Sequence, residues 1–171
     1  MADTIIDKAY EDNVTLLVYL SERTEISLLR TVDDSFRKTL LLSAASLFEH
    51  QISDALHSYC SRKSDSDACV MALIRIKGLK RQYYTYFDWE NRRPGPFFAL
   101  LGEEIGEKLR TESKIDPLKS SVEAFLELGF LRNCLVHQNF AGYVFEKTNE
   151  EVYALYRSAC VFVDRVLREL G

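Results

Sequence analysis

Apolar residues recur along most of the chain at spacings of three and four positions, which is the period of an amphipathic α-helix. The most regular series runs from Phe36 to Arg62, and the capping pattern Thr31-Val-Asp-Asp34 precedes it, so we expect a helix to begin there. An earlier series, from Thr4 to about Arg30, is interrupted by polar residues at Ser21–Thr24. It therefore forms either one long helix or two.

Capping and helix-breaking residues mark the later helices. Four are predicted: one over Ala68–Lys77, capped by Ser64–Asp67 and closed by Gly78; one over Phe97–Leu109, with Pro96 at its first position; one that begins after Asp116-Pro117; and one capped by Thr148–Glu151. The segment from Lys80 to Gly95 has no helical period and mixes aromatic with basic residues. This pattern indicates a loop or a broken helix.

The composition agrees with a helical protein. Only 7 glycines and 3 prolines interrupt 171 residues, of which 47% are hydrophobic, so the chain is far from disorder and poor in turn residues. A chain of this length buries a core without disulfides or metals. We therefore expect residues 1–171 to form a single all-α domain, a bundle of about five to seven helices.

Charge and targeting signals exclude some classes of protein. The net charge of −4 argues against non-specific coating of nucleic acid, although it leaves room for a local basic patch. No signal peptide is recognisable, and the longest apolar run, around Leu40–Phe48, is too short to span a bilayer. We expect a cytoplasmic protein without a membrane partner.

Metal and cofactor chemistry is not expected. Cys60, Cys69, Cys134 and Cys160 are widely separated and form no CxxC pair, which favours buried free thiols over a disulfide or a zinc site. His50 and His57 lie seven positions apart, which is no metal-ligand spacing, and we interpret them as ordinary polar residues. Glycine-rich phosphate loops and GxSxG are absent from the sequence.

One stretch, Glu127–Phe140, places an arginine, an amide and a histidine in an otherwise apolar helical run. Asn133 and His137 are four positions apart and share a helix face, whereas Arg132 lies about 140° around the helix from His137. Arg132 falls inside an apolar stripe, where an unpaired charge is expensive. Glu49, the one carboxylate between Leu40 and Gln51, is the candidate partner for the guanidinium.

The opposite side of the same helix is also apolar, through Leu126, Phe130 and Cys134. Both sides of the helix then need a cover, of which the bundle core supplies one. We expect a second copy of the chain to supply the other, so that the protein is a homodimer across this helix.

An arginine beside a histidine suits phosphodiester chemistry. Histidine takes and gives a proton near neutral pH, and a guanidinium holds a phosphate by two hydrogen bonds. RNA carries its own nucleophile, the 2′-hydroxyl, so these two groups can suffice to leave a cyclic phosphate. The bare spacing, however, favours a structural interpretation, in which His137 caps the helix end and Arg132 is a paired core residue.

The stretch Arg132-Asn-Cys-Leu-Val-His137, followed by Gln138-Asn139-Phe140, resembles the R-x4-6-H signature of HEPN-domain ribonucleases, including the polar residue after the arginine. The segments Phe97–Gly102 and Leu41–Leu56 resemble upstream helices of the RiboL-PSP-HEPN subgroup. Gln138 departs from the pattern, because many relatives carry glycine there, but it touches neither key residue.

This resemblance implies an up-and-down HEPN-like bundle that dimerises so that two motifs form one cleft. It implies a metal-independent endoribonuclease, a hydrolase of toxin–antitoxin, abortive-infection or other anti-phage defence systems, with RNA as substrate, no DNA partner and an antitoxin or defence protein as a further partner. By position, Arg132 and His137 are the catalytic pair, Asn133 orients the imidazole, and Asn139 and Glu49 are supporting residues. Inactive relatives bind or dimerise only, which leaves a non-catalytic RNA-, nucleotide- or protein-binding dimer as the alternative.

A second candidate region is the irregular segment. Its basic residues Lys80, Arg81, Arg92 and Arg93 could contact RNA phosphates, while its rings Tyr83, Tyr84, Tyr86 and Trp89 stack on bases. The competing interpretation is a packed aromatic loop with solvated basic ends. The remaining, more distant reading of the whole chain is a helical adaptor in which Arg132 and His137 are purely structural.

Overall fold

The computed structural model describes residues 4–64, 67–138 and 142–171. Its α-helices are α1 (Ile5–Glu22), α2 (Ile26–Lys63), α3 (Ala68–Leu73), α4 (Gly95–Leu100), α5 (Gly102–Glu112), α6 (Leu118–His137) and α7 (Asn149–Leu170). Within these ranges no β-strand forms, and the one β-bridge joins Asp88 to Arg93. The prediction of an all-α bundle is confirmed.

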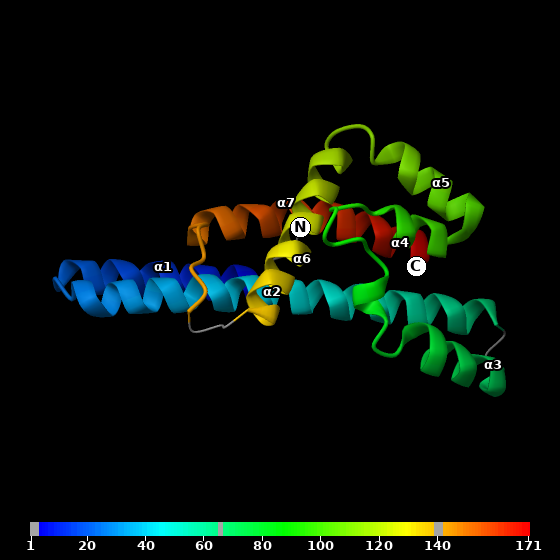
Figure 1. The fold of residues 1–171 in the computed structure, drawn as a ribbon, viewed down its shortest axis with the longest axis horizontal. Helices are drawn as coiled ribbons and strands as arrows, with labels where there is room; N and C mark the ends of the chain where they lie inside the picture. The colour runs from blue at the N-terminus through cyan, green and yellow to red at the C-terminus, as the bar shows by residue number, and fades with distance from the viewer. Residues whose placement is uncertain (1–3, 65–66, 139–141) are drawn as a thin grey trace.

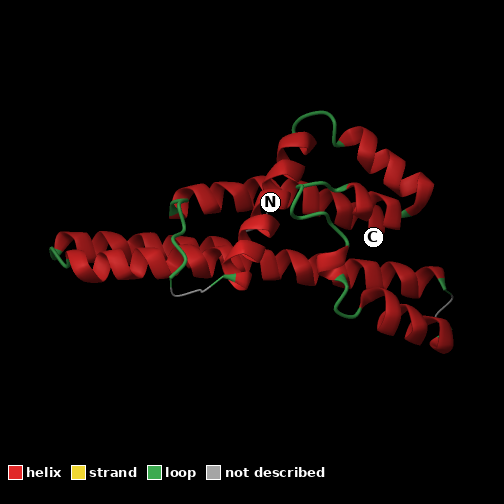
Figure 2. Ribbon diagram, viewed as in Figure 1, coloured by secondary structure: helices red, strands yellow, loops and turns green. Residues whose placement is uncertain are grey.

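The long helix α2 is the axis of the molecule (Figure 1). α1 folds back along its first part, and the pair projects from the body as a helical hairpin, while α7 runs beside the middle of α2. α6 crosses both α2 and α7, and α3 lies at the far end of α2. Short loops join most of the helices (Figure 2). No helix of the described ranges is long and apolar enough to cross a membrane.

Of the two possibilities for the first apolar series, one long helix or two, the structure has two helices, because α1 ends at Glu22 and Thr24 adopts a left-handed φ of 56°. The predicted start of the next helix at Thr31 is wrong. α2 already begins at Ile26, and the Thr31 hydroxyl donates to the carbonyl of Ser27 at 3.0 Å inside the helix. A threonine and two acids thus mimic a cap where the helix simply continues.

Other helix boundaries also differ from the predicted ones by short stretches. Asp67 caps α3 by accepting from the Val70 N–H at 2.8 Å, but Gly78 does not end the helix, which continues as a π-helix over Ile74–Leu79. The single helix predicted from Pro96 is two, because Gly102, the first residue of α5, takes a left-handed φ of 77°. The capping box that opens α7 is confirmed.

The later turn at Asp116-Pro117 contains a cis peptide bond, and Pro117 precedes α6 instead of lying inside its first turn. Asp116 still serves the helix start, since its carboxylate accepts from the Ser120 N–H at 3.1 Å. The prediction that the thiols are buried holds only for Cys160, because Cys60 and Cys134 are half-buried and Cys69 is exposed.

Aromatic rings fill the core where α2, α6 and α7 meet. The ring of Phe125 on α6 lies 5.8 Å from that of Phe48 on α2 and 5.0 Å from that of Phe162 on α7, measured between centroids. The irregular segment adds four more buried rings, those of Tyr83, Tyr86, Phe87 and Trp89. The packed-loop interpretation of this segment therefore holds for Tyr83, Tyr86 and Trp89, which have no free face for an RNA base.

A buried carboxylate fastens α1 to α7. Asp7, only 2% exposed, accepts from the Tyr153 hydroxyl at 2.7 Å, from the Arg157 guanidinium at 2.9 Å and from the Thr4 N–H at 2.7 Å. Burial alone raises the pKa of Asp7, but these hydrogen bonds outweigh it and lower the pKa from 3.8 to about 2. The charged form is thus the one that stabilises the fold.

We predict that Asp7→Asn lowers the free energy of unfolding at pH 7 by roughly 2 kcal/mol, because a carboxyl pKa depressed by nearly two units contributes about that much. The stability that Asp7 contributes is complete above its unfolded pKa near 3.8 and is lost as the pH falls toward 2. Urea denaturation between pH 7 and pH 3 measures the difference between the two proteins, which should narrow below pH 4. Asp12→Asn, an exposed change on the same helix, is the control and should leave the free energy of unfolding nearly unchanged. A difference between wild type and Asp7→Asn that stays constant down to pH 3 would contradict the assignment.

Candidate functional site

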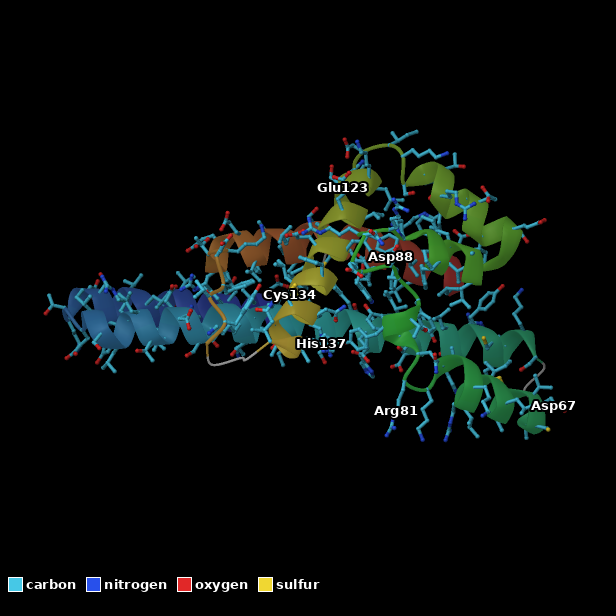
Figure 3. All side chains as sticks on the ribbon, viewed as in Figure 1. Asp67, Arg81, Asp88, Glu123, Cys134 and His137 are labelled. Carbon is cyan, nitrogen blue, oxygen red and sulfur yellow. The ribbon has the colours of Figure 1, made fainter. Side chains whose placement is uncertain are left out.

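The last two turns of α6 carry the predicted motif. The helix ends at His137, and Gln138 is extended, with its N–H bonded to the carbonyl of Cys134 at 3.1 Å. Figure 3 shows Cys134 and His137 at the end of α6 that crosses α2. Asn139 lies outside the described residues.

Arg132 is half-buried and lies against the irregular segment. Its guanidinium carbon is 4.0 Å from the centre of the Tyr84 ring, and its Nη1 donates to the side-chain oxygen of Asn133 at 3.2 Å. A cavity of only about 10 Å³ remains among Arg132 and the neighbouring rings. The inner side of Arg132 is thus filled by protein.

Glu49 does not pair directly with Arg132, because no nitrogen of Arg132 lies within 4.0 Å of its carboxylate in the described part of the chain. Instead Glu49 accepts a hydrogen bond of 2.7 Å from the hydroxyl of Tyr84. The expected ion pair is therefore replaced by two contacts to Tyr84, whose hydroxyl binds the carboxylate and whose ring lies against the guanidinium.

Tyr84 is the site residue whose place sequence reasoning missed. Its backbone carbonyl accepts from the Trp89 indole N–H at 3.0 Å, and its ring meets Tyr83 edge-on. Burial, followed by the hydrogen bond to Glu49, raises the pKa of Tyr84 well above its usual value, so the hydroxyl stays protonated near neutral pH. The sequence marked Tyr84 only as a ring that could stack on an RNA base. No pattern in the sequence indicates that the irregular segment packs against α6.

His137 is exposed on the final turn, and Asn133 is half-buried one turn earlier. The side-chain oxygen of Asn133 is engaged by Arg132, which ties the two neighbouring residues together. Since α6 is helical throughout, Arg132 and His137 point about 140° apart, as their spacing predicts. In one chain they face different surfaces.

The four predicted RNA-contacting cations differ in their surroundings. Lys80 and Arg81 are exposed, and Arg81 extends from the lower edge of the molecule in Figure 3. Arg92 pairs with Glu127 at 2.6 Å and covers the ring of Phe130 at 4.5 Å. Arg93 is exposed, while its backbone forms the bridge to Asp88. Arg92 is thus bound to two residues of α6 and is less available to RNA than the other three cations.

The outer side of α6 is more closed than expected. Leu126 is 1% exposed within a single chain, so the expectation that a partner must cover it is wrong. Phe130 and Cys134 are half-buried, and Val136 near the helix end is 47% exposed. Nearer the start of α6, a groove of about 660 Å³ opens toward α7 and is lined by Arg92, Glu127 and Lys147 among others. Neither Arg132 nor His137 lines this groove.

An all-α bundle whose crossing helix ends in an arginine and a histidine five residues apart defines the class of HEPN-like domains. The RiboL-PSP-HEPN family model matches residues 8–170, and the chain belongs to this family. The resemblance noted in the sequence is confirmed. Comparisons with curated proteins and with solved structures found no match.

The contact between α6 and the irregular segment depends on Gly129. A Cβ added there would lie 1.9 Å from Cζ3 and 2.2 Å from Cε3 of Trp89, whose side chain is buried. These distances are far below van der Waals contact. The absence of a side chain lets the indole lie on the helix backbone and hold the carbonyl of Tyr84.

We predict that Gly129→Ala lowers the free energy of unfolding by about 3 kcal/mol, because a rigid buried ring must move. Chemical denaturation measures this loss, and the emission of Trp89, the one tryptophan of the chain, should shift in the native state. Gly78→Ala is the matched control, since nothing lies within 4 Å of its added Cβ. Equal stability of the two variants would show that the indole does not pack on α6 in this way.

Proposed function

We propose that the protein is an endoribonuclease of the HEPN type that cleaves RNA without a metal ion. The observation that carries the proposal is the placement of Arg132 and His137 on the last two turns of α6 in a chain of this family. His137 is exposed at the helix end, where it can act as a general base or a general acid. As a base it takes the proton from the 2′-hydroxyl, and as an acid it gives a proton to the departing 5′-oxygen. Arg132 holds the phosphate oxygens as the 2′-oxygen attacks phosphorus and the 5′-oxygen leaves, which yields a cyclic phosphate.

The active form in this proposal is a homodimer across α6. Arg132 and His137 of one chain face directions about 140° apart, so two copies are the simplest way to direct both groups at one phosphodiester. Phe130, Cys134 and His137 follow one another along one side of α6, and the first two are only half-buried. This side supports contact with the same helix of a second copy.

The remaining roles extend the same proposal. Asn133 and Asn139 support the catalytic pair, and Glu49 supports it only through its hydrogen bond with Tyr84. The exposed Lys80, Arg81 and Arg93 contact the RNA backbone. Because Arg92 is held by Glu127, its contribution to RNA binding is indirect. The enzyme acts in the cytoplasm, within a toxin–antitoxin or anti-phage system whose antitoxin or other protein partner restrains it.

One observation favours a second candidate, a HEPN dimer that binds RNA, nucleotide or protein without cleaving. The guanidinium of Arg132 is already stacked on Tyr84 and bonded to Asn133, and the space behind it is filled. A residue so engaged also suits a purely structural role. Cleavage assays separate the two candidates.

We predict that purified protein cleaves labelled single-stranded RNA in the presence of EDTA and leaves 2′,3′-cyclic phosphate ends. His137→Ala should lower the rate by at least about 100-fold, the usual contribution of a general acid–base group, and Arg132→Ala by a similar factor. His50→Ala, an exposed histidine on α2, is the matched control and should cleave like wild type. Cleavage by His137→Ala at the wild-type rate refutes the assignment, and no cleavage by wild type favours the binding module.

We predict that the protein sediments as a dimer at micromolar concentration. Cys134→Arg should shift it to monomer, because a charge without a partner is placed in the contact between the two helices. Glu123→Arg is the control, a change of charge on the same helix nearer its start. Sedimentation velocity measures both variants, and a monomeric wild type contradicts the dimer.

A further inference from the structure

Three groups from three parts of the fold stand in a row beside the motif. Glu49 comes from α2, Tyr84 from the irregular segment and Arg132 from α6. The hydroxyl of Tyr84 donates to the carboxylate at 2.7 Å, and the ring of Tyr84 faces the guanidinium at 4.0 Å. The carboxylate and the guanidinium thus both contact Tyr84, and within the described part of the chain they do not pair with each other.

We propose that Tyr84 is a positioning residue that keeps Glu49 away from Arg132, so that the guanidinium stays available to a phosphate. The inference rests on the proposed ribonuclease function for its catalytic consequence. Its structural part, the separation of the two charges, stands on the contacts themselves.

The geometry of a guanidinium explains why a ring is a suitable neighbour. All five N–H donors of arginine lie in the plane of the group, whereas a cation–π contact uses only its flat face. Contact with Tyr84, together with the bond from Nη1 to Asn133, therefore restricts the direction of Arg132 without pairing it with a carboxylate. A direct pair with Glu49 would consume two of those donors in a bidentate bond.

The hydroxyl of Tyr84 has a separate task. By donating to Glu49 it satisfies the carboxylate, which otherwise lies half-buried with a cation nearby. The raised pKa of Tyr84 agrees with a hydroxyl that keeps its proton for this purpose. The backbone carbonyl of Tyr84 is held by the Trp89 indole, which fixes the backbone position from which the ring projects.

Removal of the hydroxyl alone should release Glu49. In Tyr84→Phe the ring remains, and the carboxylate loses its donor and turns to the guanidinium. We expect kcat for RNA cleavage to fall about tenfold or more with KM changed less than about threefold, because the lost interaction is one made to the reacting phosphate. Tyr86→Phe is the matched control, since it also loses a tyrosine hydrogen bond, to the carbonyl of Gly78, without touching Arg132.

A double-mutant cycle separates positioning from general stability. When Glu49→Gln has removed the charge that captures Arg132, adding Tyr84→Phe should change kcat by less than about threefold. If Tyr84→Phe costs the same factor with and without the Glu49 carboxylate, the proposal is overturned, because a merely structural tyrosine gives that result. Melting temperatures of the four proteins check that all are folded.

A measurement without catalysis distinguishes failure of this inference from failure of the proposed function. In the crystal structure of Tyr84→Phe we expect a nitrogen of Arg132 to lie about 2.9 Å from an oxygen of Glu49, and in the double variant we expect the stacked arrangement. This outcome supports the separation of charges even if the wild type cleaves no RNA. A guanidinium that stays on the phenyl ring with Glu49 turned elsewhere overturns it.

Discussion

The packing of one indole on one glycine organises the site. Trp89 lies against the backbone of α6 at Gly129, and this contact brings the whole irregular segment down onto the crossing of α2 and α6. The same indole donates to the carbonyl of Tyr84, which sets the ring against Arg132. A segment without helical period is thereby anchored to the core, since its buried rings pack with those of the helices.

Two carboxylates, those of Asp7 and Glu127, also connect different parts of the fold. Asp7 is satisfied by donors from its own helix start and from α7, so that its charge supports the docking of the first helix. Glu127 on α6 holds Arg92 above Phe130 and also lies 3.8 Å from Lys147, which ties the segments before and after α6 to that helix. Asp7 and Glu127 thus join elements that are far apart in the sequence.

The sequence predicted the helical class, the cap of α7 and the position of Arg132 and His137 near a helix end, because these depend on periodicity and on residues close together in the chain. It left open whether the chain breaks after α1. It could not predict that α2 runs through Thr31, since a capping pattern is also compatible with a continuing helix. The place of Tyr84 beside Glu49 and Arg132 depends on the packing of Trp89, and the burial of Leu126 depends on contacts with other parts of the same chain. Neither leaves a local signal.

α2 is one continuous helix, but only its central part is held by buried side chains. Its buried apolar residues all fall between Leu40 and Leu56, and no residue between Ile26 and Arg37 or between His57 and Lys63 is buried. Helices supported in this way open from their ends inward, because the terminal turns lose little packing when they fray. Glu49 lies in the central part, so the carboxylate beside the motif belongs to the portion of α2 that opens last, even when the hairpin and the far end of the helix fluctuate.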